Sequence, residues 1–242
     1  MNRIVLMCLR NFWRVPYLYF KLCKYARHPE RYSREEMYAH IKYIFELAVK
    51  SGNIDLTITG TENIPEDGGF LMYANHQGLF DILALCVSQE KPWAAVLKKE
   101  LNKIPVLKQM VACTNSFPMD REDVRASMKV IQSVIDEVND GKRYLIFPEG
   151  TRSRNGNELL EFHGGSFKCA LKTKAPVVPV ALIDCFKVLD QKGSKPVAVQ
   201  IHYLPPIQYE EYKDMKTGEL ANLVRDRIQA KITEIVGEKN MN

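Results

Sequence analysis

The stretch GGFLMYANHQGLFDILALCVS, residues 68–88, indicates the fold class more directly than any other part of the sequence. Its first half is a short apolar run after a glycine pair, which is typical of a buried β-strand. Residues 81–88 form an apolar helical pattern, so a turn at about 75–80 joins strand to helix. A strand that leads directly into a helix is the repeating unit of layered α/β proteins.

The same alternation continues on both sides of this stretch. Before it, residues 32–52 predict a helix, with Ser33 as N-cap, Glu36 in the capping-box position and Gly52 to end it. Further helices are expected at 121–141 and around 220–235, and further strands at 54–59, 93–98, 143–147, 176–183 and 197–204. We therefore predict a layered α/β domain around a largely parallel sheet, residues 53–242, preceded by an N-terminal helical segment, residues 1–52.

The composition excludes several classes of protein. The chain has 242 residues, of which 46% are hydrophobic, enough for one full core. Its six cysteines lack the spacing of a disulfide framework or a zinc site. We therefore expect neither a disulfide framework nor a structural zinc site, and a reducing, cytosol-facing location. We also expect no metal, no cofactor and no nucleic-acid partner.

Most of the excess positive charge lies in residues 1–34, which carry eight basic side chains and a single acidic one. On a helical wheel five of them form a narrow stripe on an otherwise apolar and aromatic surface that includes Trp13. The stripe consists of Arg3, Arg10, Arg14, Lys21 and Lys24. Uncharged runs here do not exceed six residues, whereas a spanning helix needs about 20. We predict a helix that binds the bilayer surface; the alternative is an ordinary amphipathic helix packed on the domain and broken at Pro16.

Two side chains capable of acid–base chemistry, His76 and Asp81, follow the end of the strand in 68–88. In open α/β sheets the ligand crevice lies at such strand ends. Across the turn, Asp81 can fold back onto the imidazole, which would fix one ring nitrogen as a donor and leave the other free to accept a proton. The pair predicts a general base; the alternative is a buried histidine held by an aspartate for structural reasons.

No nucleophile of the protein's own accompanies this base. The G-x-S-x-G spacing of hydrolases is absent, because the glycines around Ser166 are wrongly spaced. Cys86 and Cys113 lie in apolar stretches with nothing to mark them as thiolates. We therefore expect the substrate to supply the nucleophile and His76 to deprotonate its hydroxyl group.

A second informative stretch is YLIFPEGTRSR, residues 144–154. Here an apolar strand is stopped by a proline and brings Glu149, Gly150, Thr151 and Arg152 to the same edge of the sheet. Glycine allows close backbone approach, and arginine can bind a phosphate with two hydrogen bonds. The stretch predicts a phosphate cradle; the alternative is a solvated charged loop.

Together these stretches resemble a known family, the PlsC-type 1-acylglycerol-3-phosphate acyltransferases. NHQGLFD, residues 75–81, resembles the family's HxxxxD motif, and FPEGTRSR, residues 147–154, matches its FPEGTRS motif. Three weaker blocks agree in type and order: KKELNKIP at 98–105, FPMDR at 117–121 and PVVPVAL at 176–182. The resemblance thus covers most of the body of the chain, from about residue 70 to residue 182.

The resemblance implies an enzyme that transfers an acyl group from acyl-CoA or acyl-carrier protein to the sn-2 hydroxyl of lysophosphatidic acid, forming phosphatidic acid. In that scheme His76 is the base and Asp81 orients it. Glu149, Gly150, Thr151 and Arg152 help to position the acceptor, with Lys98 and Arg121 as further contacts. The expected location is the cytoplasmic face of a membrane, bound peripherally to the phospholipid bilayer. Alternatives are another acceptor (glycerol 3-phosphate or a different lysophospholipid), a thioesterase or other hydrolase, and a non-catalytic lipid-binding module.

Overall fold

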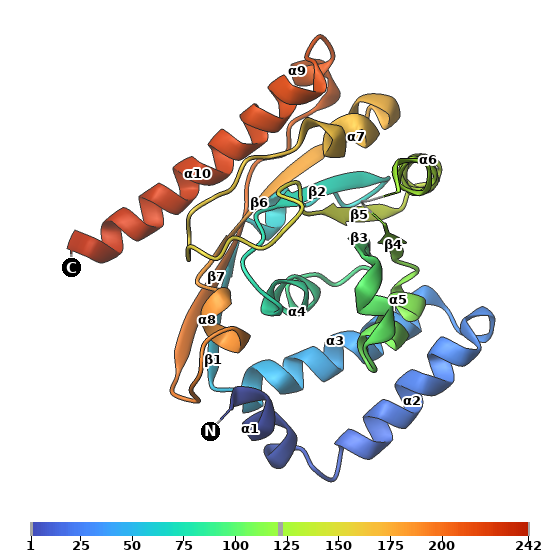
Figure 1. Cartoon of the computed structure of the whole chain (residues 1–242), viewed down its shortest axis with the longest axis vertical. Helices are drawn as coiled ribbons and strands as arrows, with labels where there is room; N and C mark the ends of the chain where they lie inside the picture. The colour runs from blue at the N-terminus through green and yellow to red at the C-terminus, as the bar shows by residue number, and fades with distance from the viewer. Residues whose placement is uncertain (1, 121–122, 242) are drawn as a thin grey trace.

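Within residues 2–120 and 123–241, which the computed structural model describes, a seven-stranded sheet lies between two groups of helices (Figure 1). The strands are β1 (Ile54–Thr59), β2 (Phe70–Ala74), β3 (Ala94–Lys98), β4 (Phe117–Met119), β5 (Arg143–Ile146), β6 (Val177–Ile183) and β7 (Val197–Tyr203). Their order across the sheet is β1-β7-β6-β2-β5-β3-β4, and neighbouring strands are parallel except for β6 and β7. The predicted α/β architecture with a mostly parallel sheet is confirmed.

The helices connect these strands and cover both faces of the sheet (Figure 1). They are α1 (Arg3–Arg10), α2 (Val15–Arg27), α3 (Arg34–Ser51), α4 (Phe80–Val87), α5 (Leu107–Thr114), α6 (Val124–Asn139), α7 (Lys168–Thr173), α8 (Phe186–Leu189), α9 (Tyr209–Tyr212) and α10 (Thr217–Met241). Short 3-10 turns occur at Pro29–Arg31, Thr61–Asn63, Lys99–Lys103 and Gly164–Phe167. The ends of α3 lie where the sequence predicts them: Ser33 accepts a hydrogen bond from the Glu36 amide, and Gly52 follows the last residue.

Alternate residues of the central strands enter two separate hydrophobic cores. In β2, Phe70 and Met72 face the core beneath α3 and α4, while Leu71 and Tyr73 face the core beneath α6, α7 and α10. All of β2 is buried, because helices cover both faces of this central strand. Its carboxyl end, where Asn75 and His76 follow, is therefore held from both sides.

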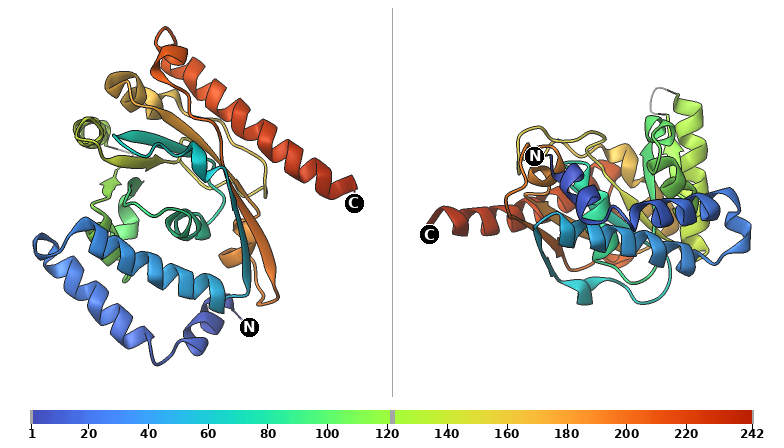
Figure 2. Two further views of the ribbon diagram at one scale, coloured as in Figure 1. Left: turned by 180° about the vertical axis from the view of Figure 1, so that it is seen from behind. Right: turned by 90° about the horizontal axis from the view of Figure 1, so that it is seen from below.

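Helix α3 belongs to the body of the protein rather than to a separate N-terminal segment. Its residues Met37, Tyr38, Ile41 and Phe45 are buried in the same core as β2. The boundary expected at residue 52 is thus not a boundary between packed units. Only α1 and α2 lie outside α3, as the outermost layer on the side away from α6 and α7 (Figures 1 and 2).

The expected single basic helix is divided in two, and this changes where its charges point. The chain turns between α1 and α2, and Pro16 lies in the first turn of α2, where its missing N–H leaves no hydrogen bond unmade. Arg3 was expected on the membrane face, but it is only 5% exposed and donates to the carbonyl oxygens of Gly52, Val188 and Lys195. Its assignment to the membrane face is corrected: Arg3 joins α1 to the body of the protein.

Arg10 is also used within the protein. One of its amino groups, Nη1, donates to the carbonyl oxygen of Ser51 and to Asn53 Oδ1. Trp13, Arg14 and Lys24 are exposed and Lys21 is partly exposed. In the part of the chain that the structure describes, no helix has the length and apolar character needed to cross a membrane.

Candidate active site

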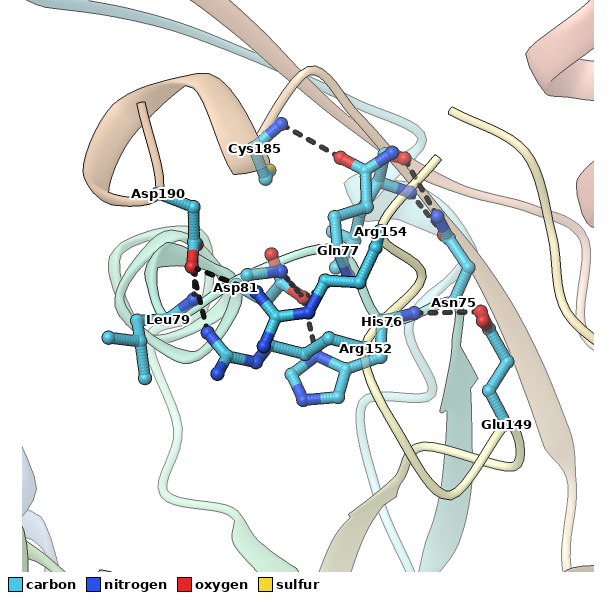
Figure 3. Close-up of polar contacts among 12 residues, drawn as sticks. Asn75, His76, Gln77, Leu79, Asp81, Glu149, Arg152, Arg154, Cys185 and Asp190 are labelled. Atoms are coloured by element: carbon cyan, nitrogen blue, oxygen red, sulfur yellow. Dashed lines mark hydrogen bonds and ion pairs between the residues drawn. The ribbon is translucent and has the colours of Figure 1, made fainter. Parts of the chain in front are cut away.

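His76 and Asp81 meet across the turn between β2 and α4. Nδ1 of His76 lies 2.7 Å from Oδ2 of Asp81, which is completely buried in the first turn of α4 (Figure 3). The same Oδ2 accepts hydrogen bonds from the backbone amides of Gln77 and Gly78. Because a carboxylate only accepts, Nδ1 carries a proton and Nε2 of the imidazole is left as the acceptor. The predicted arrangement of an oriented base is therefore present in the geometry.

The backbone of His76 is fixed by the segment that follows β5. Its amide donates to Oε1 of Glu149 at 2.9 Å, and its carbonyl oxygen accepts from the amide of Ser153 at 2.8 Å. The ring of Phe147 stacks on the imidazole with a centroid distance of 4.2 Å. The two sequence motifs thus interlock, and the second sets the position of the histidine in the first.

Glu149 has a different place from the one expected of it. It is only 2% exposed, and its second oxygen, Oε2, accepts from the amide of Leu160. Burial raises the pKa of this carboxyl, while the hydrogen bonds from the His76 and Leu160 amides oppose the rise. We correct its assignment as a substrate contact: Glu149 lies behind His76 and positions the histidine loop.

The remaining described residues that were predicted to contact substrate line one cavity together with His76, and Gly150, Thr151 and Arg152 lie beside His76 at its polar end. Gly150, Thr151, Arg152 and Lys98 all line it. Gly150 has a φ of 70°, a left-handed conformation that favours glycine and turns the chain after Pro148. Arg121, the other predicted contact, lies outside the described residues.

Arg152 is held by an acidic residue that the sequence analysis did not identify. Its Nη1 donates to Oδ1 of Asp190 at 2.8 Å, and Nη1 of Arg154 lies 3.8 Å from the same oxygen (Figure 3). The other carboxylate oxygen of Asp190 accepts from the backbone amide of Leu79 at 3.2 Å. Asp190 follows α8, more than 100 residues away from Leu79 in sequence, and no local pattern marks it.

From this polar end the cavity extends between α3, α4, α5 and β3, with a volume of about 580 Å³. Apart from the polar end, its lining is mostly apolar. Lining residues include Tyr38, Ile41 and Phe45 of α3, Ile82 and Leu83 of α4, and Met110 and Val111 of α5. The cavity thus offers apolar walls of three helices next to an oriented histidine.

No described serine, threonine or cysteine side chain hydrogen-bonds to the imidazole of His76. Cys86 also lines the cavity, but burial raises the pKa of its thiol to about 12. Burial raises the pKa of Cys113 to about 12 as well. A thiol with so high a pKa is protonated at neutral pH and is a poor nucleophile. Among the described residues, the oriented imidazole of His76 is thus not hydrogen-bonded to a nucleophilic side chain of the protein.

A polar network supports the histidine loop from the other side. The side chain of Gln77 accepts from the amide of Cys185 and donates to Oδ1 of Asn157 and to the carbonyl oxygen of Gly156. Asn75 exchanges two hydrogen bonds with the backbone of Leu182 in β6. These partners are distant in sequence, and only the amide side chains beside His76 hint at them.

Among the described residues, no group of three or more His, Cys, Asp or Glu side chains is arranged to hold a metal ion. Oδ2 of Asp81 is instead directed to the imidazole and to two backbone amides, and both oxygens of Glu149 accept from backbone amides.

Comparison of the sequence with known proteins identifies a family model and several relatives that match this chain. A family model described as Acyltransferase matches residues 55–183. The 1-acyl-sn-glycerol-3-phosphate acyltransferase of Borreliella burgdorferi is 28% identical over 75% of this chain and 73% of its own length. The enzyme of the same name from Saccharomyces cerevisiae is 30% identical over 75% of this chain, which spans 61% of that longer protein. For the Escherichia coli enzyme the identity is 30% over 69% of each chain.

A solved structure shares the fold over almost the whole chain. The crystal structure of the 1-acyl-sn-glycerophosphate (LPA) acyltransferase, PlsC, from Thermotoga maritima aligns with a TM-score of 0.75, covers 96% of both chains and is 24% identical in sequence.

Proposed function

Because the chain belongs to the acyltransferase family, we propose that it transfers a fatty acyl group from a thioester to the sn-2 hydroxyl of a 1-acyl-sn-glycerol 3-phosphate, forming phosphatidate. The observation that carries this proposal is the oriented His76–Asp81 pair, which has no nucleophile of its own and lies beside Arg152 at the polar end of an apolar cavity. The relatives are named for the same reaction.

In the proposed reaction, Nε2 of His76 accepts the proton of the acceptor's hydroxyl as its oxygen attacks the thioester carbonyl carbon. The tetrahedral intermediate then collapses, the carbon–sulfur bond breaks, and the imidazolium returns the proton to the leaving thiolate. Asp81 stabilises the imidazolium in between. The acyl group thus passes directly from the donor to the acceptor, and the ester and the free thiol form without an acyl-enzyme intermediate.

The charged and apolar parts of the site match the two parts of such substrates. Arg152 at the polar end, and Lys98, which also lines the cavity, supply positive charge for the phosphate of the acceptor. The apolar cavity suits an acyl chain, since each buried methylene contributes about 0.8 kcal/mol to binding. The donor thioester, carried by CoA or by acyl-carrier protein, is the remaining substrate.

For the membrane, we infer that α1 and α2 lie in the interface of the bilayer. These two helices and the turn between them expose nine large apolar or aromatic side chains, an unusually dense group for a protein surface. These are Ile4, Val5, Leu9, Phe12, Trp13, Val15, Tyr17, Tyr19 and Phe20. Arg14, Lys21 and Lys24 on the same segment provide charge for anionic headgroups. Peripheral attachment on the cytosolic side is the corresponding location.

The test is an acceptor panel with purified protein in mixed vesicles. Thiol release and acylated product are followed together, with acyl-CoA and acyl-carrier protein as donors. The acceptors are lysophosphatidate, glycerol 3-phosphate, lysophosphatidylcholine and none. We expect thiol release to require lysophosphatidate and to equal phosphatidate formed. Release without an acceptor would make the protein a thioesterase, and product from another acceptor would change the substrate.

A further inference from the structure

We propose that Asp190 is a positioning residue for acceptor binding: it holds Arg152 so that the free edge of the guanidinium faces the phosphate, and it ties that arginine to the loop that carries the catalytic histidine. This inference rests on the proposed function, because it names the phosphate of the acceptor as the group that Arg152 meets.

The first support is the way in which Arg152 is held. The hydrogen bond from Nη1 to Asp190 Oδ1 is the only one that the described residues make with this guanidinium. Nε and Nη2 therefore keep their N–H groups for a ligand. These two groups form the edge of the fork that binds a phosphate with two parallel hydrogen bonds.

The second support is the contact between Asp190 and the start of α4. Its Oδ2 accepts from the amide of Leu79, which directly precedes α4 and lies three residues after His76. A β-carbon added to Gly78 would lie 2.3 Å from the same oxygen, so only glycine leaves room for the carboxylate here. One side chain thereby links the arginine of the second motif to the turn of the first.

Asp190 is itself placed by α8. Its backbone amide donates to the carbonyl oxygen of Phe186, the first residue of α8, so Asp190 caps the C-terminal end of this short helix. The side chains of Asp190 and Arg152 are only 21% and 26% exposed. An exposed ion pair contributes little, but this pair is partly buried and is completed by a backbone amide, so it defines a geometry rather than only balancing a charge.

Electrostatics alone would give Asp190 the opposite role, because its negative charge repels a phosphate dianion. The two roles predict opposite changes in affinity when the carboxylate is removed. If it positions Arg152, affinity for the phosphate falls, since the freed side chain must be ordered on binding. If it competes with the phosphate, affinity rises. The unengaged edge of Arg152 favours positioning.

The experiment compares Asp190→Ala and Asp190→Asn with the wild type and with Asp226→Ala, which removes an exposed aspartate on α10. Binding of 1-hexanoylglycerol 3-phosphate, and of 1-hexanoylglycerol as the ligand without phosphate, is measured by calorimetry on the full chain. Melting temperatures confirm that each variant is folded. The KM and kcat for lysophosphatidate are then measured in vesicles.

For Asp190→Ala we expect the Kd of the phosphate ligand and the KM for lysophosphatidate to rise about tenfold, as for loss of one charge-assisted contact. Asp190→Asn keeps an oxygen acceptor and should fall between Asp190→Ala and the wild type. The Kd of the phosphate-free ligand, the KM of the donor and all values for Asp226→Ala should stay within about twofold.

Unchanged or tighter binding of the phosphate ligand in folded Asp190 variants would overturn the inference. So would a loss shared equally by the two ligands, because that is the result of a merely structural role. The two proposals can fail separately. If the Kd of the phosphate ligand rises in the Asp190 variants as expected but the wild type transfers no acyl group, the proposed function is wrong while the role of Asp190 stands.

Discussion

Replacing Asp81 with asparagine separates the charge of this residue from its shape. Oδ2 of Asp81 accepts from Nδ1 of His76 and from the amides of Gln77 and Gly78. The amide oxygen of the introduced asparagine must take the same place, because its amino group would otherwise face two backbone donors. The imidazole therefore keeps its orientation and its tautomer, and only the negative charge beside it is lost.

The size of the effect follows from that charge. Two unit charges about 4 Å apart interact by about 4 kcal/mol at the effective dielectric constant of about 20 that suits partly buried sites. This is the stabilisation that the imidazolium loses in the transition state. At about 1.4 kcal/mol per factor of ten, kcat should fall about a thousandfold. The KM values for both substrates should change little, since Asp81 is completely buried and does not line the cavity.

The assay is thiol release from the donor thioester with lysophosphatidate present, alongside a melting curve. In the Asp81→Asn protein an amino group replaces Oδ1, which is buried without a hydrogen-bond partner among the described residues, so some loss of stability is expected too. Asp226→Asn serves as the matched control. A folded Asp81→Asn enzyme with a kcat within about threefold of the wild type would refute the assignment of Asp81 to the stabilisation of the histidine.

Three further results are expected. In Glu149→Gln, the introduced amino group faces one of the two backbone amides from which Glu149 accepts hydrogen bonds. The melting temperature should therefore fall by about 2–10 °C, and kcat should fall with it. An unchanged melting temperature would contradict the positioning role of Glu149. Replacing Trp13 and Phe20 with aspartate should weaken sedimentation with anionic vesicles at least about tenfold, whereas aspartate at the exposed Met128 on α6 should not; equal binding by both variants would place the membrane contact elsewhere. Burial lowers the pKa of His40 in the folded protein, so the unfolded chain binds the proton first and the free energy of unfolding should fall as pH drops through about 6.5. This fall should be smaller in His40→Gln. If the free energies of unfolding of the two proteins differ by the same amount at every pH, the prediction is wrong.

Local sequence patterns were sufficient for the longer elements of the body and for the pairing of His76 with Asp81, but not for the short elements β4, α5, α7, α8 and α9. The capping residues around α3, the apolar run of β2 and the five-residue spacing from His76 to Asp81 all act within a single turn or strand. Such features are set by nearby residues, and the structure reproduces them. The grouping of Gly150, Thr151 and Arg152 beside His76 was predicted for the same reason, because these residues follow directly from one strand end; their binding of a phosphate stays a prediction.

The parts that sequence reasoning missed depend on contacts between distant residues. The burial of Arg3 is decided by the carbonyl oxygens of Val188 and Lys195, and the role of Glu149 by the amide of His76, which follows another strand. A helical wheel drawn through α1 and α2 as one helix could not show that the chain turns between them. A charged side chain in a motif likewise gives no sign of whether it faces a ligand or a backbone amide.

The central claim is that His76 activates the acceptor's hydroxyl directly and that no acyl-enzyme forms. A single-turnover experiment with enzyme in excess over acyl thioester, with intact-protein mass spectrometry, tests it for the wild type and His76→Ala. The account predicts no thiol release and no added acyl mass without lysophosphatidate, rapid release with equal phosphatidate once it is added, and neither in the variant. An acylated protein before the acceptor is added, or transfer that survives in His76→Ala, would contradict it.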